Sequence, residues 1–414
     1  MPDRGMQTDA EFLQDREIAT WLAEAGLQGL KAPDLLVGFG ERLNRAGFAV
    51  VRGNLSMETL HPQVRGYNHV WRRETGLEVS DSFTHQEGER PEYLRSPLQY
   101  MLEHGLYRMR RRLDRPSNEP DFAIFQEFRD AGMTEWYARG FLLGWSADIN
   151  DRGQIGMITT WTTDRAGGFG DGWFDRLDAL LPPFALAVKS AITREIAESV
   201  VGTYLGRDAG GRVLRGEILR GSVQSVSAVL FYADLRGFTR LADTVPRNDL
   251  VTMLDDYLDR IATPVEARGG QVLKFLGDGL LATFALDGGD TAAVCDTALA
   301  AAGDVLKGIG DMNRSRQAAG APVMDLDIAL HMGEVLYGNV GSASRLDFTV
   351  IGPAVNEASR IEALCEELDV NLLISNSFNK AGNGCGGRLE SVGRHTLRGV
   401  REAQDLFTVR MPAS

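Results

Sequence analysis

The stretch Val229-Leu-Phe-Tyr-Ala-Asp-Leu-Arg-Gly-Phe-Thr239 decides the fold of the second half of the chain. It opens with a continuous apolar run, which at this length predicts a buried strand. Asp234 stands where that strand ends, and Gly237 follows it in a turn toward a predicted helix. A carboxylate in this position suits a hard cation with phosphates beside it. An Asp before a helix also serves as a helix cap, so this stretch alone leaves both roles open.

A second carboxylate comes from the downstream stretch that runs from Gly269 to Phe284. Two runs of strand character flank Gly277-Asp278-Gly279, and Asp-Gly between such runs is a strong hairpin signal. Asp278 is therefore expected at a hairpin tip, with Lys274 in the incoming strand. Two carboxylates at the edge of a buried sheet can hold two divalent ions. Sites of that kind activate one oxygen and stabilise another at a phosphorus centre.

Composition narrows the class of protein. The chain has 414 residues, 43% of them hydrophobic and 24% charged, which predicts a soluble globular protein of two or three domains. The formal charge of −13 argues against a nucleic-acid surface. No apolar run reaches the roughly 18 residues that span a bilayer, and Met1–Ala10 lacks the apolar core of a signal peptide. Cys295, Cys365 and Cys385 lack metal-ligand spacing, which predicts free thiols in a reducing, cytoplasmic setting.

The first half, residues 1–185, predicts a mixed α/β sensor-like domain with a central antiparallel sheet. Its expected elements are helices over Glu11–Leu30, from Pro33, over Met57–Arg73 and from Gly172, with strands over Phe48–Arg52 and Gly153–Thr162. Aromatic residues crowd the segment from Phe122 to Leu143 and are expected to form core, with a ligand pocket as the alternative. The segment Ile158–Leu181 resembles the end of GAF-type sensor domains in its order of strand, Arg-Ala-Gly-Gly-Phe-containing loop and helix. That resemblance covers only this tail.

Residues 186–224 are expected to form a helical signalling and dimerisation linker. Apolar residues fall on one narrow stripe at heptad-like steps, which favours pairing with a second copy: Ile192, Ile196, Val200, Val201 and Tyr204. Glycines between Gly206 and Gly216 break the helical pattern, so that the connection can bend or rotate. A passive spacer is the alternative interpretation.

Residues 225–414 predict a separate domain of the α+β class. Strand, helix, hairpin, helix and strand follow one another from Val229 to Gly333, which is the order of a ferredoxin-like βαββαβ core with additions. A further strand over Leu346–Ile351 precedes a helix from Pro353 to about Leu368. Asn356 and Arg360 are neighbours on that helix, where an amide and a guanidinium together suit a sugar-phosphate ligand. A surface polar pair is the alternative.

Four segments, taken in order and spacing, resemble the catalytic domain of class III nucleotidyl cyclases. They are Phe231–Thr239, Lys274–Asp278, His331–Gly341 and Thr349–Arg360. The resemblance implies that Asp234, Leu235 and Asp278 bind two divalent ions, Mg²⁺ or Mn²⁺. It also implies that Lys274 contacts the purine, that Asn356 orients the ribose, and that Arg360 stabilises charge at the α-phosphate. Arg398, in Leu397-Arg-Gly399, is the expected cation near the terminal phosphates.

The helix start after the first carboxylate adds a phosphate cradle. Backbone amides at a helix N-terminus favour anions, so Gly237, Phe238 and Thr239 are expected to bind the phosphates. His331 and Gly333 also match the family but are interpreted as strand packing. In this family the site lies between two catalytic domains, and this chain carries both sets of residues in one domain. A head-to-tail homodimer with two sites is therefore expected.

One position departs from the commonest family pattern and bears on the choice of base. Thr349 stands where many adenylate cyclases have Asp as a second purine reader. A Thr hydroxyl can accept a hydrogen bond from an exocyclic amine, and the combination of Lys274 with Thr349 is similar to a subgroup that includes bicarbonate-responsive cyclases. The expected activity is conversion of ATP to 3′,5′-cyclic AMP and pyrophosphate, under the control of an effector of the first domain that the sequence does not identify. A guanylate cyclase and a non-catalytic nucleotide-binding sensor are the alternatives.

Overall fold

The computed structural model describes residues 8–59, 64–84, 91–143, 156–286, 288–400 and 402–409. The chain forms two compact units, Met1–Val200 and Val201–Ser414. In the described residues no helix is long and apolar enough to cross a membrane. Cys295, Cys365 and Cys385 are buried free thiols, as expected from their spacing.

The first unit is built on a six-stranded sheet whose strand pairs are all antiparallel, as predicted. Its order is β3-β2-β1-β6-β5-β4. The strands are β1 (Val50–Glu58), β2 (Val64–Arg72), β3 (Gly76–Thr84), β4 (Arg108–Arg112), β5 (Glu135–Leu142) and β6 (Gly156–Thr163). The start of the strand predicted from Gly153 lies outside the described residues.

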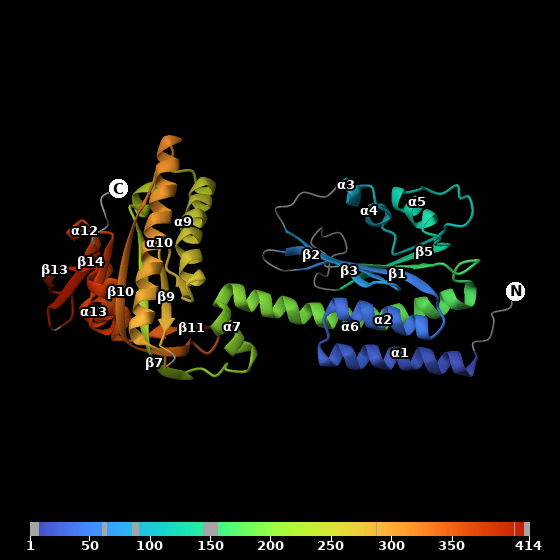
Figure 1. Ribbon diagram of the computed structural model, residues 1–414, viewed down its shortest axis with the longest axis horizontal. Coiled ribbons are helices and arrows are strands. Elements are labelled where there is room, and N and C mark those ends of the chain that lie inside the picture. The colour runs from blue at the N-terminus through green and yellow to red at the C-terminus, as the bar shows by residue number, and fades with distance from the viewer. Residues whose placement is uncertain are drawn as a thin grey trace. The chain divides into compact units, whose positions relative to one another are not determined.

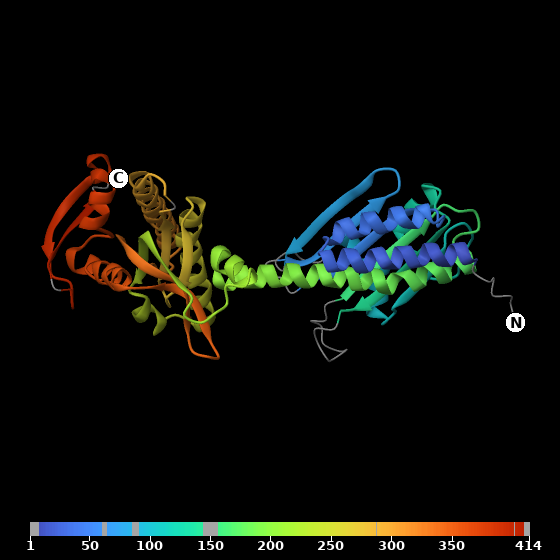
Figure 2. The ribbon, with the colours of Figure 1, turned by 90° about the horizontal axis from the view of Figure 1, so that it is seen from below.

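Helices cover both faces of this sheet (Figure 1). Helices α1 (Asp9–Gln28), α2 (Ala32–Arg45) and α6 (Asp171–Leu205) run alongside one another over one face (Figure 2), and α3 (Pro91–Leu94), α4 (Pro97–Glu103) and α5 (Ala123–Asp130) lie over the other. Successive side chains of a strand point to opposite faces, so Tyr137 joins the core under α2 and α6 while Trp136 joins the core under α4 and α5. The aromatic cluster is thus confirmed as core, and the resemblance to GAF-type domains stays a prediction.

One expectation for this half needs correction. The helix predicted over Met57–Arg73 is wrong, because the described part of that segment contains the end of β1 and the whole of β2, which pair in antiparallel register with Asn54 opposite Val70. The glycine break predicted in the helical linker is present: α6 ends at Leu205, and α7 covers Arg207–Leu214. Gly206 separates them with a φ of +83°, in the left-handed range that glycine adopts without strain.

The apolar stripe predicted to pair with a second copy, from Ile192 to Tyr204, is buried in its first part and exposed at its end. Ile192 and Ile196 are buried in the core of the first unit, where they pack with residues of α1 and α2. Tyr204, near the end of α6, is 79% exposed. The first half of the stripe therefore serves the fold of its own domain, and only the later residues are open to another molecule.

The second unit contains the predicted βαββαβ order. It runs β7 (Val223–Arg236), α9 (Arg247–Ala267), β8 (Gln271–Phe275), β9 (Leu280–Ala285), α10 (Thr291–Ala318) and β10 (Asp325–Gly341). These strands lie in the order β10-β7-β9-β8 within an eight-stranded sheet. Additions follow: β11 (Leu346–Ile351), α11 (Pro353–Glu362), α12 (Cys365–Leu368), β12 (Leu372–Ser375), α13 (Asn376–Ala381), β13 (Leu389–His395) and β14 (Gln404–Val409).

Strand β7 lies near the middle of this sheet and is covered on both faces. Phe231 and Leu235 belong to a core shared with α9 and α10, while Leu230 belongs to a second core shared with α7 and α11. A strand buried on both faces requires a continuous apolar run, which explains the composition of the stretch from Val229 onward. The end of β7 is thereby fixed in space, and Asp234 with it.

Candidate active site

Asp234 and the Asp278 hairpin meet at one edge of the sheet. Ala233 of β7 pairs with Leu280 of β9, so Asp234 lies next to Gly279, where a Cβ atom would clash with the Asp234 carboxylate. The hairpin closes with a hydrogen bond of 2.8 Å that the Leu276 N–H donates to the Gly279 carbonyl. The sequence prediction that both carboxylates lie at one edge is consistent with this geometry, since Asp278 is next to Gly279 in the turn.

The electrostatics of this edge are strongly negative. Burial, and then the charges of Asp278 and Asp327, raise the pKa of Asp234 to about 6. Burial, followed by Asp234, Asp327 and Asp278, raises the pKa of Glu362 to about 8. Asp327 has a partner of its own, because Arg236 donates to its two oxygens at 2.5 and 2.9 Å. Among the described residues, no ion pair joins Asp234 or Asp278 to an Arg or Lys side chain, and a bound cation would relieve the repulsion between them.

The start of α8 (Phe238–Ala242) follows directly on this edge. Gly237 precedes the helix with a φ of +87°, which lets the chain turn sharply away from the sheet. Thr239 is exposed, whereas the Leu235 side chain is 2% exposed and packed in the core. Only the backbone of Leu235 is therefore able to serve as a ligand, while Thr239 lies at the surface and Phe238 packs partly against the core.

Helix α11 presents Asn356 and Arg360 away from its own core. Ala358 and Ile361 are buried beneath the helix, and Asn356 is exposed. The flank of α11 that turns toward β7 carries Ser359, which shares a hydrogen bond with Tyr232. With 3.6 residues in each turn, Asn356 and Arg360 lie on the side of α11 opposite the buried stripe.

Arg360 lies beside the loop that contains Arg398. A Cβ atom on Gly399 would be 3.5 Å from the Arg360 guanidinium, an ordinary van der Waals distance, so the two residues are neighbours. Arg398 itself is exposed. The two arginines that the sequence assigns to the phosphates thus belong to one region of the domain.

Lys274 and Thr349 come from strands that do not pair with each other. Lys274 lies on β8 and is exposed, and Thr349 lies on β11 and is 9% exposed. The Lys274 ammonium forms an ion pair of 2.5 Å with the carboxylate of Asp347, also on β11. Sequence reasoning missed this partner of Lys274.

Three residues near the predicted site were not indicated by the sequence: Asp327, Glu362 and Asp347. Asp327 lies on β10 opposite Asp234, and only the pairing of β7 with β10 brings it there. Glu362 lies at the end of α11 and reaches the acids through the packing of that helix on β7. No local motif marks any of the three, because each contact joins segments far apart in sequence.

Helix α7 packs beneath the strands that carry Lys274 and Thr349. Ala209 of α7 shares a core with Phe348 of β11, and Leu273 of β8 packs against that core. The Tyr337 hydroxyl donates a hydrogen bond of 2.9 Å to Asp208. The segment that leads into the catalytic unit is therefore in direct contact with the elements expected to read the base.

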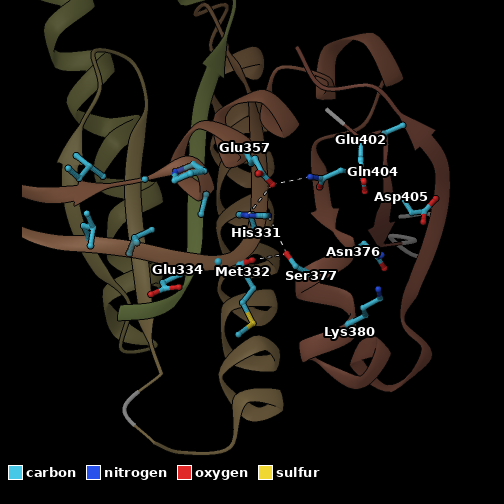
Figure 3. A pocket seen from close by; sticks show the side chains of 18 of the residues that line it. His331, Met332, Glu334, Glu357, Asn376, Ser377, Lys380, Glu402, Gln404 and Asp405 are labelled. Carbon is cyan, nitrogen blue, oxygen red and sulfur yellow. Dashed lines mark hydrogen bonds and ion pairs between the residues drawn. The ribbon is translucent and has the colours of Figure 1, made fainter. Parts of the chain in front are cut away.

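A separate cavity of about 820 Å³ lies between α11, α13 and β14 and contains none of the predicted site residues (Figure 3). At its centre the His331 imidazole lies 3.7 Å from the Glu357 carboxylate. Gln404 donates a hydrogen bond of 2.9 Å to the same carboxylate, and Ser377 donates one of 2.7 Å to the Met332 carbonyl. Burial lowers the pKa of His331, against the opposing effect of Glu357. These contacts tie β10, α11 and β14 together, in keeping with a packing role for His331.

Comparison with known proteins identifies the class of the second unit. Residues 221–410 match the family described as "Adenylate and Guanylate cyclase catalytic domain", and this part of the chain is a class III nucleotidyl cyclase catalytic domain. Domains of this class bind a nucleotide substrate, commonly dimerise and generally use divalent metal ions. The matched residues lie within the second unit.

Relatives with a curated name share part of this chain. An adenylate cyclase from Anabaena cylindrica is 35% identical over 161 residues, 38% of this chain and 31% of that protein. Adenylate cyclase 1 of Rhizobium meliloti is 28% identical over 208 residues, 50% of this chain and 28% of that protein. The chain spans about a third of the length of these relatives.

Solved structures of both adenylyl and guanylyl cyclases resemble the second unit. The adenylyl cyclase CyaB from P. aeruginosa is 22% identical and covers 46% of this chain and 97% of its own, with a TM-score of 0.42. The guanylyl cyclase Cya2 is 24% identical and covers 45% of this chain and 93% of its own, with a TM-score of 0.40.

Proposed function

We propose that this protein is an adenylate cyclase that converts ATP to 3′,5′-cyclic AMP and pyrophosphate at sites shared between two copies of the chain. One observation carries the proposal: the charges of Asp234 and Asp278 interact at one edge of the sheet, while Asn356 is exposed and Arg360 half-buried on the side of α11 opposite its buried stripe. Each chain thus offers two different half-sites. A head-to-tail homodimer would join the acids of one copy to the outward residues of the other.

Exposed apolar side chains support the homodimer. Phe275, next to Lys274 in the chain, is 52% exposed, and the cross-strand pair Leu336 and Ile351 is 40% exposed at each residue. A second copy docked on these strands would cover these apolar side chains. Their position beside Lys274 and Thr349 would let one contact surface serve both association and substrate binding.

The carboxylates of Asp234 and Asp278, with the Leu235 backbone, would hold two divalent ions, Mg²⁺ or Mn²⁺. When bound, such ions lower the pKa of a hydroxyl and neutralise triphosphate charge. The 3′-oxygen of the ribose attacks the α-phosphorus in line, and pyrophosphate leaves. Both carboxylates must be ionised for this role; with a pKa of about 6, Asp234 is mostly ionised above pH 7, and a bound cation would extend the ionised form to lower pH.

The remaining site residues would position the substrate. Asn356 orients the ribose, and Arg360 donates to charge that develops at the α-phosphate in the transition state. Arg398 would contact the terminal phosphates. The backbone amides of Phe238 and Thr239, after the turn at Gly237, would contact the phosphates of the substrate held by the acids.

Lys274 and Thr349 favour ATP as the substrate. A Lys ammonium only donates hydrogen bonds, whereas a Thr hydroxyl can accept one from the exocyclic amine of adenine. The curated relatives named above are adenylate cyclases, which agrees with this choice. A guanylate cyclase is the second candidate, because guanylyl cyclases also resemble the second unit. A non-catalytic nucleotide sensor is disfavoured, since every expected chemical position is occupied.

The first unit would regulate the second through α6 and α7. Helix α6 begins in the first unit and ends in the second, and α7 packs on the strands that carry Lys274 and Thr349. A change in the first unit that moves α7 would alter the base-reading strands. The effector, whether a small molecule or an ion, would act on residues 1–185.

Purified protein incubated with Mn²⁺ and ATP tests the proposal. We expect cyclic AMP and pyrophosphate in equal amounts by chromatography and mass spectrometry, and much slower formation of cyclic GMP from GTP. Faster turnover of GTP would favour the guanylate cyclase. Turnover of neither nucleotide, with nucleotide binding retained, would favour the sensor.

A further inference from the structure

The ion pair between Lys274 and Asp347 joins two hairpins that do not otherwise pair. In the described residues β8 pairs with β9 and β11 pairs with β10, and no backbone ladder connects the two hairpins directly. The Lys274 Nζ and the Asp347 Oδ2 are 2.5 Å apart. The contact therefore fixes the end of a long, flexible side chain against a strand from another part of the domain.

Asp347 and Thr349 lie on the same face of β11. Successive side chains alternate along a strand, and the intervening Phe348 is buried in the core with Val350. The partner of Lys274 and the proposed acceptor for the adenine amine are thus adjacent positions on one surface. Lys274 is held where a base bound near Thr349 would meet its ammonium.

This ion pair is too exposed to serve mainly as a stabilising contact. The Lys274 side chain is 42% exposed and that of Asp347 is 49% exposed, and pairs of this kind contribute little to folding stability. We expect the ion pair to have a larger effect on ligand binding than on folding stability. A free Lys side chain loses many rotamers when it binds a base, and a side chain that is already ordered loses fewer.

We propose that Asp347 is a positioning residue for base recognition, which acts by holding the Lys274 ammonium ready to donate to the purine ring. The proposal rests on the proposed function, because it assumes that Lys274 contacts the base. A Lys ammonium has three donor hydrogens, so the bond to Asp347 leaves others for the ligand. Asp347 itself needs no contact with the nucleotide.

A double-mutant cycle in the full chain tests this role. Asp347→Ala should raise the Kd of α,β-methylene-ATP and the KM of ATP about ten-fold, with little change in kcat, and Lys274→Ala should raise both further. In the Lys274→Ala background, Asp347→Ala should cause no additional loss. Asp347→Asn, which keeps the shape and a hydrogen-bond acceptor, should recover part of the affinity.

A matched control uses another ion pair of similar exposure, that between Arg268 and Asp304. Asp304→Ala removes the partner of Arg268, whose side chain is 39% exposed, and should leave nucleotide binding unchanged. An unchanged Kd in Asp347→Ala, or losses in the two single variants that multiply in the double variant, would overturn the role of Asp347. The binding measurement does not depend on turnover. If no cyclic AMP forms but the binding cycle still shows coupling between Asp347 and Lys274, the result would contradict the proposed function and leave the role of Asp347 in nucleotide binding intact.

Discussion

The edge that carries Asp234 and Asp278 differs in kind from the face that carries Asn356 and Arg360. The acids come from β7 and the hairpin between β8 and β9, which are neighbours in one sheet, and their charges already interact within a single chain. Asn356 is exposed on the outer side of α11, directed away from the domain core. The proposed acidic half-site is thus under electrostatic repulsion within one chain, whereas the proposed half-site on α11 faces away from its own core.

That difference explains why two copies would be needed. Repulsion between the acids raises the affinity of this edge for protons and for metal cations alike, so this half-site is built for positive charge. The outward face of α11 provides an amide and a guanidinium, which suit sugar and phosphate but not a cation. A substrate that binds to both the acidic edge and the outward face of α11 requires these two surfaces to meet. Within one chain, α11 turns a different flank toward β7.

The largest expected effect comes from removal of an acid. Asp278→Ala should reduce the rate of cyclic AMP formation by on the order of 10³-fold or more, because one carboxylate alone would not hold the two ions. Initial rates with Mn²⁺ and ATP measure this. Asp255→Ala, which removes an exposed acid on α9, is the control and should retain full activity. Comparable losses in both variants would contradict a special role for the edge.

Removal of the guanidinium should have the next largest effect. Arg360→Ala should lower kcat by on the order of 10²–10³-fold with a smaller change in KM, because the guanidinium acts on charge that develops in the transition state. Steady-state kinetics separate the two constants. A variant that loses only affinity for ATP would show that Arg360 binds the ground state instead.

Base preference should change by a smaller factor. Replacing both readers, Lys274→Glu with Thr349→Cys, should reduce the ratio of kcat/KM for ATP to that for GTP by about ten-fold or more, since the donor and acceptor pattern at the base is altered. Parallel assays with the two nucleotides give the ratio. An unaltered ratio would exclude these positions as base readers.

The smallest expected effect is on thermal stability and its dependence on pH, in protein from which divalent ions have been removed. The pKa of Asp234 is about 6 in the folded state, whereas its ordinary value is 3.8. The folded state therefore binds this proton more tightly than the unfolded state, and the stability gained in this way is lost as the pH rises from 3.8 to about 6. Asp234→Asn should therefore raise Tm at pH 7.5 by about 2–4 °C, a gain that shrinks as the pH falls below 6. Differential scanning calorimetry in a chelator measures it. A variant less stable than the wild type at pH 7.5 would argue against repulsion at this edge.

Local signals were sufficient to predict much of the second unit. The apolar run from Val229 and the Gly277-Asp278-Gly279 turn are both short-range features, and they predicted β7, the hairpin and the position of Asp234 at a strand end. Asp347 and Glu362 were not predictable in this way. Their contacts depend on how hairpins and helices pack, which no sequence spacing records.

The first unit shows where periodicity misleads. Val64, Tyr67 and Trp71 follow one another at three- and four-residue steps, which is helical spacing, yet they lie on β2. The strand has register irregularities between Val64 and Gly66 and between Val70 and Trp71, and each irregularity shifts the alternation of faces. A sequence pattern alone cannot distinguish a bulged strand from a helix when the partner strands are unknown.

Complementation between two inactive variants tests the central claim most directly. Asp278→Ala and Arg360→Ala, each inactive alone, are mixed under conditions that allow subunits to exchange. A heterodimer would contain one site with both changes and one intact site, so the mixture should recover about a quarter of wild-type activity. Recovery of that size is the predicted result, and a mixture as inactive as its two components would contradict a site shared between chains.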